Sequence, residues 1–154
     1  MNAAVDAKTE EFVANKMLIY HSARRIKRAR EIPGGNNVLI LENAYQTAEH
    51  EVQSLMKKTN DDAKNGQGPK DIQGVMERML VVSQKMSERD EKREAVKKAW
   101  SELGKTDEKI AELNAKYDQT NKRYIDAVEA VRQAGGQSGG FLTGCKIKIR
   151  MENE

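Results

Sequence analysis

The residues best suited to chemistry in this sequence are cations gathered within a seven-residue stretch: Arg24, Arg25, Lys27, Arg28 and Arg30. Such a cluster can contact the phosphates of nucleic acid or an anionic membrane surface. It can equally complement the dipole at a helix C-terminus and pair with acidic residues of the next helix, such as Glu42, Glu49 and Glu51. We favour the second interpretation, because no aromatic platform lies within the cluster and the net charge is only +3.

Metal and phosphate sites are not expected. The two histidines, His21 and His50, lie on different expected helices and far from the single Cys145, whereas zinc needs clustered ligands. The loop that begins at Asp61 lacks the carboxylate that a calcium loop needs at its twelfth position. The glycines of 139–144 have neither a preceding strand nor a following helix, as a phosphate-binding loop would. We therefore expect no cofactor.

Cys145 is a candidate nucleophile without a recognisable base. It lies between a glycine and a lysine, with neither histidine nearby in the sequence, and nucleophilic catalysis needs a base beside the nucleophile. No other acid–base or nucleophile constellation is recognisable. We therefore expect that the protein is not an enzyme.

The composition favours elongated helices over a thick globular core. Apolar residues make up 38% of the 154 residues, against a usual share of about 45–50% that also counts Gly. Charged residues make up 33%, and there are only two prolines. Long stretches are therefore free to be helix, each burying a narrow apolar stripe.

Glycine and proline divide the chain into helical segments expected around 6–30, 39–60 and 71–133. The expected fold class is mainly all-α, an antiparallel helical hairpin or coiled-coil bundle of three to four helices. Gly104 is the ambiguous point. If the chain turns there, two helices of about thirty residues form an antiparallel hairpin; if it does not, one helix runs for about 90 Å. We favour the hairpin, because the three–four spacing of apolar residues breaks just at Gly104.

The last helical segment has the clearest periodicity. Its apolar residues step by three and four, as one stripe aimed at a partner helix requires. We expect these residues to form a helix-packing or oligomer seam: Ile72, Val75, Met79, Val82, Met86, Ile110, Leu113, Tyr117, Tyr124 and Val131.

The end of the chain changes character. A helical domain over 1–134 is followed by a Gly-rich linker over 135–140 and a strand-like tail over 141–154. In the tail, apolar residues alternate with basic ones, which is the period of a strand. The hypothesis is that the tail pairs with a strand of another subunit or partner; a disordered tail is the alternative. Its apolar face would consist of Cys145, Ile147, Ile149 and Met151.

No secretory signal and no apolar run near the twenty residues of a membrane span is visible, and a single cysteine suits a reducing compartment. A cytoplasmic location is therefore expected, with signal-less export or incorporation into a larger particle left open. The leading hypothesis is a non-catalytic helical scaffold or adaptor that binds other protein chains, itself included. The alternative is a nucleic-acid- or anionic-surface-binding protein that uses the cluster from Arg24 to Arg30.

Overall fold

The computed structural model describes residues 3–135, and these form four helices. In chain order they are α1 (Ala3–Glu31), α2 (Gly35–Lys64), α3 (Ile72–Thr106) and α4 (Glu108–Gln133). The described part of the chain contains no strand, so the mainly all-α fold class is confirmed there. The tail expected over 141–154, with Cys145, Ile147, Ile149 and Met151, lies outside the described residues.

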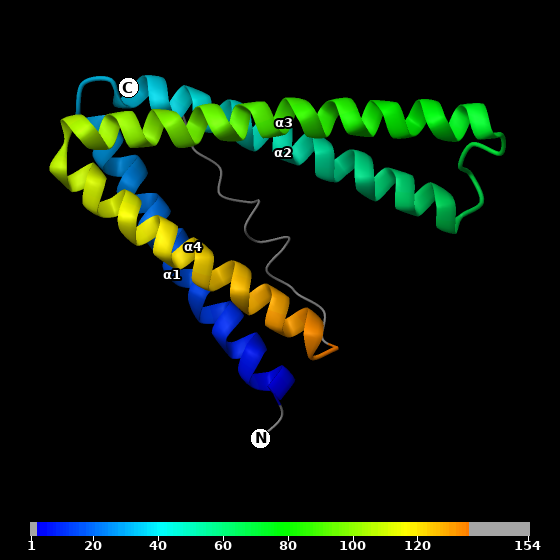
Figure 1. The fold of residues 1–154 in the computed structure, drawn as a ribbon, viewed down its shortest axis with the longest axis horizontal. Helices are drawn as coiled ribbons and strands as arrows, with labels where there is room; N and C mark the ends of the chain where they lie inside the picture. Colours follow the sequence, from blue (N-terminus) through cyan, green and yellow to red (C-terminus); the bar gives the residue numbers. More distant parts are fainter. Residues whose placement is uncertain (1–2, 136–154) are drawn as a thin grey trace.

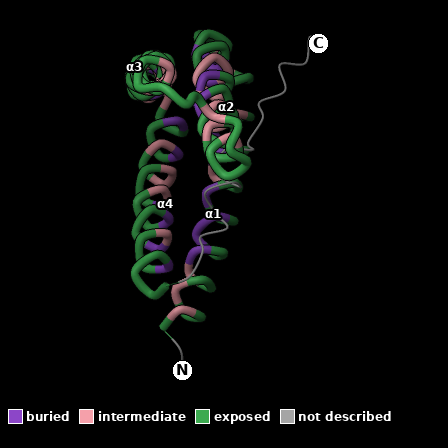
Figure 2. Tube along the Cα trace, turned by 90° about the vertical axis from the view of Figure 1, so that its right-hand side faces the viewer, coloured by how far each residue is buried: buried purple, intermediate pink, exposed green. Residues whose placement is uncertain are grey.

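The helices form two arms that diverge from a common vertex (Figure 1). In one arm α1 lies along α4, and in the other α2 lies along α3. The corner between α1 and α2 meets the corner between α3 and α4 at the vertex. Figure 2 shows buried residues where α1 and α4 face each other, while their outer faces are exposed. The first helix of the chain therefore pairs with the last, and the middle two pair with each other.

Two consecutive glycines make the corner between α1 and α2. Gly34 has a φ of 82°, a left-handed conformation that glycine adopts without the cost a side chain imposes. At Gly35 an added Cβ would lie 1.7 Å from the carbonyl oxygen of Ala29. Only a residue without a side chain permits this close approach, so α2 begins at Gly35, four residues before its expected start.

The expected break near Gly104 is present, but the expected hairpin is not. Asp107 has extended backbone angles (φ −142°, ψ 116°), and its carboxylate accepts a hydrogen bond of 3.0 Å from the Ile110 N–H, which caps α4. Beyond this corner α3 and α4 diverge (Figure 1). The expectation that these two helices pack antiparallel along their length was wrong, because the apolar stripe of α4 is buried against α1, where Tyr124 clusters with Ala14 and Leu18.

The larger apolar core lies at the vertex and draws on all four helices. Its buried members are Ala29, Val38, Leu39, Val96, Trp100, Leu103 and Ile110. The tips of the arms lie away from this core. The vertex therefore holds the arms together, and each arm is otherwise only two helices thick.

Candidate functional site

Arg25 of the basic cluster lies inside the vertex, where it is 4% exposed. Its guanidinium carbon lies 4.1 Å from the ring centroid of Trp100 in α3 and 3.9 Å from that of Tyr117 in α4. Its Nη1 donates a hydrogen bond of 3.3 Å to the Asn114 Oδ1, and the Asn114 Nδ2 donates one of 2.8 Å to the Trp100 carbonyl. A planar cation stacked on aromatic rings is a favourable arrangement when both are removed from water. Arg25 therefore joins α1 to α3 and α4.

Glu42 of α2 is a buried carboxylate whose charge acts on Arg25. Burial lowers the pKa of Arg25, and the charges of Tyr117 and Glu42 act in the opposite direction. Burial likewise raises the pKa of Glu42, against the opposing charge of Arg25. An arginine stays protonated at any ordinary pH, so the buried charge is structural. Of the acidic residues of the second helix that were expected to face the cluster, Glu42 is the one whose charge acts on Arg25.

Arg28 is also used inside the molecule. Its Nε and Nη2 donate hydrogen bonds of 3.1 and 2.7 Å to the two carboxylate oxygens of Asp107. This bidentate pair fixes the residue that caps α4 to the end of α1. The guanidinium of Arg28 lowers the pKa of Asp107, mainly through its hydrogen bonds.

The structure thus divides the basic cluster between two roles. Lys27 and Arg30 are exposed on α1, and Arg24 is half-buried, with its guanidinium 5.4 Å from the Tyr20 ring centroid. Glu49 and Glu51, which were expected to face the cluster, instead pair with Arg89 and Lys85 of α3. The cluster therefore does not present five cations on one surface.

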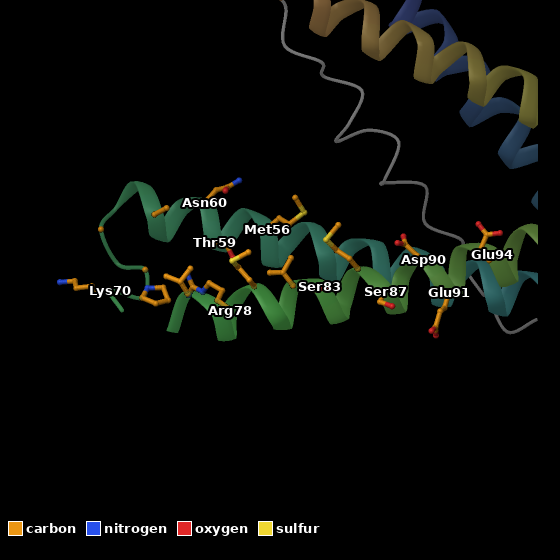
Figure 3. A pocket seen from close by; sticks show the side chains of 18 residues that line it. Met56, Thr59, Asn60, Lys70, Arg78, Ser83, Ser87, Asp90, Glu91 and Glu94 are labelled. Atoms are coloured by element: carbon orange, nitrogen blue, oxygen red, sulfur yellow. The ribbon is translucent and has the colours of Figure 1, made fainter. Parts of the chain in front are cut away.

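A large groove lies between α2 and α3, away from the core at the vertex (Figure 3). It has a volume of about 1320 Å³. On α2 it is lined at helical spacing by Met56, Thr59, Asn60 and Ala63, and on α3 its apolar lining is Val75, Met79, Val82 and Met86. We call this the α2–α3 groove.

The groove is open because the two helices bury almost nothing between them here. Every buried residue of α3 lies in its last third, at Val96, Trp100 and Leu103. Small polar side chains, such as Thr59 and Ser83, occupy positions at which two closely packed helices would need large apolar side chains. Ion pairs span the arm instead, of which the shortest joins the Arg78 Nη2 to the Asp62 Oδ2 at 2.9 Å, with longer ones from Lys85 and Arg89.

Large apolar side chains stay exposed along the same part of the arm. Ile72 is 79% exposed and Met79 is 65% exposed. The others are Met56, Val75, Met76, Leu80 and Val81. A continuous run of this kind on a helix marks an interaction surface, whereas single exposed apolar residues are ordinary.

The predicted seam is split between an internal contact and this groove. Ile110 is buried in the vertex core, and Leu113, Tyr124 and Val131 are buried farther along α4, in its arm with α1. Tyr117 is half-buried and lies against Arg25. The earlier members of the seam, from Ile72 to Met86, are exposed or half-buried. The α2 wall of the groove was not predicted from the sequence, although the helical spacing of its lining residues was a usable signal. These residues are Met56, Thr59, Asn60 and Ala63.

The groove offers apolar contact and helix backbone more than reactive groups. Its lining contains no histidine and no cysteine. Within residues 3–135 no group of three or more His, Cys, Asp or Glu side chains could hold a metal ion. None of the four helices is apolar over a length that would cross a bilayer.

No protein family model, no curated protein and no solved structure matches the chain. Its function must therefore be inferred from the residues and their geometry.

Proposed function

We propose that this chain is a non-catalytic helical assembly protein, a scaffold or adaptor that works by helix–helix contact through its α2–α3 arm. The observation that carries the proposal is the run of α3 from Ile72 to Ala95, which has no buried side chain and yet exposes large apolar residues such as Met79 and Leu80. Two helices without a packed seam gain little stability from each other. A further protein surface laid on the groove would supply the missing contact.

A measurement of molar mass in solution tests this proposal. The full chain is examined across a wide concentration range, with and without a generic DNA duplex, by light scattering after size exclusion and by sedimentation. We expect a mass above the 17.3 kDa of one chain that rises with concentration. A chain that stays monomeric throughout, and captures no protein partner through the groove, would contradict the proposal.

The alternative proposal, binding of nucleic acid or an anionic surface, depends on fewer cations than the sequence suggested. Arg25 is stacked inside the vertex and Arg28 is paired with Asp107. Contact with phosphates or an anionic surface would therefore use Arg24, Lys27 and Arg30. Three cations support only weak phosphate contact that salt suppresses.

A further inference from the structure

We propose that the α2–α3 groove is covered by the α2–α3 arm of a second copy of this chain, related by a two-fold axis, so that the two arms complete an antiparallel four-helix bundle. This inference rests on the proposed function and names its partner and its orientation. Three properties of the groove carry it: its size, the arrangement of its charges and the register of its residues.

The size of the face suits a small dimer. The groove-lining residues of α3 and the preceding loop run from Lys70 to Glu94. At 1.5 Å per residue that is about 35 Å of length, and two helices side by side are about 18 Å wide. Covering such a face removes about 600 Å² from each copy, or about 1,200 Å² in all, which is the lower end of the range for stable interfaces. A short peptide or a small ligand would leave most of this length uncovered.

The charges on the groove lining are polarised along the arm. Lys70 and Arg78 lie at the loop end, and Asp90, Glu91 and Glu94 lie toward the vertex (Figure 3). Within the arm Arg78 is already paired with Asp62 and Asp90 with Arg89, so a second copy would meet chiefly Lys70 at one end and Glu91 and Glu94 at the other. A second copy laid parallel would set like charges against each other. A second copy laid antiparallel sets the loop end of each arm over the acidic end of the other, and complementary charges favour that orientation.

The register places the apolar residues at the centre. Residues 70 and 94 are equidistant from residue 82, so an antiparallel pair that matches Lys70 with Glu94 has its two-fold axis near Val82 and Ser83. Met79 and Met86 flank that centre on the groove lining. In a two-fold interface each contact occurs twice with the roles exchanged. The centre is therefore apolar and adaptable, because Met fills irregular space, while the rims carry the charges.

The first test uses the full chain and a matched control. Val75→Glu together with Met79→Glu puts charge into the proposed interface, and Ile125→Glu adds a charge at a residue of α4 that is 55% exposed. We expect a dimer of twice 17.3 kDa whose dissociation constant rises more than about tenfold with the first pair and is unchanged by Ile125→Glu. Circular dichroism checks that all variants stay helical.

Orientation is tested by crosslinking in a Cys145→Ser background. Ser83→Cys lies beside the proposed two-fold axis, so its copies should form an intermolecular disulfide under mild oxidation with oxidised glutathione. Lys70→Cys should not form a disulfide, because the two copies of residue 70 would lie at opposite ends of the interface, on the order of 35 Å apart. Lys70→Glu should weaken the dimer, and adding Glu94→Lys to the same chain should restore it.

The outcomes separate this inference from the proposed function. A dimer that survives Val75→Glu with Met79→Glu, or one in which Lys70→Cys also crosslinks, overturns the inference while self-association stands. Loss of the dimer on deletion of 141–154 would also overturn the inference while self-association stands. The tail would then either fill the groove or form the dimer contact itself. A chain that is monomeric at every concentration overturns both.

Discussion

The guanidinium carbon of Arg25 lies 4.1 Å from the ring centroid of Trp100, and this contact joins the first helix to the third at the point where the two arms meet. On its other side the same guanidinium lies 3.9 Å from the ring centroid of Tyr117 in α4. Glu42 of α2 contributes the opposing charge. One side chain thus contacts or balances groups from all three other helices, so the vertex should depend on it strongly.

Replacement of Arg25 should lower the stability of the whole domain. We expect Arg25→Ala to lower the free energy of unfolding by about 3 kcal/mol, since it removes both ring contacts and leaves Glu42 buried beside no cation. Arg25→Lys should also destabilise, because an ammonium cannot stack as a planar guanidinium does. Urea denaturation followed by circular dichroism measures both. The matched control is Lys27→Ala, which is exposed and should change stability by less than about 0.5 kcal/mol; equal stability of Arg25→Ala and this control would contradict the prediction.

The pair of Arg28 and Asp107 should make stability depend on pH. The hydrogen bonds of Arg28 lower the pKa of Asp107 below its ordinary value of 3.8. A carboxyl group with a lowered pKa in the folded state contributes stability that is present above the unfolded pKa and lost as pH falls through the folded pKa. The stability difference between the natural chain and Asp107→Asn should therefore be largest at neutral pH and shrink in acid.

That comparison is made by urea denaturation at a series of pH values. Taking the stability difference cancels the contributions of other acidic groups with lowered pKa values, such as Glu10 and Glu112, because these groups titrate in both chains. A difference that stays constant from neutral pH into acid would mean that the ionised form of Asp107 contributes nothing at the corner.

The corner between α1 and α2 should tolerate no side chain at Gly35. An added Cβ would lie 1.7 Å from the Ala29 carbonyl oxygen, which belongs to backbone and cannot rotate away. Gly35→Ala should therefore lower the free energy of unfolding by about 3 kcal/mol, the upper end of what overpacking costs. Gly68→Ala is the control, since its Cβ would meet only the Arg78 Nη1 at 3.9 Å. Thermal melts of the two variants should differ clearly, and similar melts would be evidence against this close approach.

Binding of a generic DNA duplex, where it is observed, should be weak and fall steeply with salt. Counterion release by Arg24, Lys27 and Arg30 is the source of such binding. Changing all three to Gln should abolish it and leave the helical spectrum unchanged, because Arg25 and Arg28 make the vertex contacts. Fluorescence anisotropy at several salt concentrations measures this. Tight, sequence-selective and salt-insensitive binding would move the nucleic-acid proposal to first place.

The tail hypothesis predicts an effect on assembly and none on the helices. Deletion of 141–154 should leave the far-ultraviolet circular dichroism of the helices intact, because they lie in residues 3–135. If the tail adds a strand to a neighbour, the deletion should remove assemblies larger than the dimer or abolish capture of a partner strand. Light scattering of the two chains side by side decides this; a truncated chain that assembles and binds as the full chain does would leave the segment without this role.

The helices were predictable because their limits are set locally. Gly, Pro and capping residues mark each end, and the apolar spacing between them is helical. The pairing of the helices was not predictable in the same way. The stripe of α4 fits α1 or α3 equally well as a pattern, and only the corner at Asp107 and the buried cluster of Ala14, Leu18 and Tyr124 decide between them.

The division of the basic cluster into cations that make internal contacts and cations that do not could be predicted only in part from the sequence. Arg25 and Arg28 are three residues apart and so share one face of a helix, as Arg24 and Lys27 share another. The spacing does not say which face turns inward. Burial of Arg25 depends on Trp100 and Tyr117, which are far away in the sequence, so the stacking could not be found from local spacing.

The pairing of the first helix with the last sets an order on how this protein can fold as it is synthesised. The contacts between α2 and α3 close across a short loop, so that hairpin can form while the ribosome is still adding residues. By contrast, α1 has no partner along its length until α4 has left the exit tunnel, and contacts of such long separation form slowly. During this interval the face of α1 that carries Leu18 and Arg25 is open to water. We therefore expect the growing chain to be most open to chaperones and proteases at its beginning, the part that has been outside the ribosome longest.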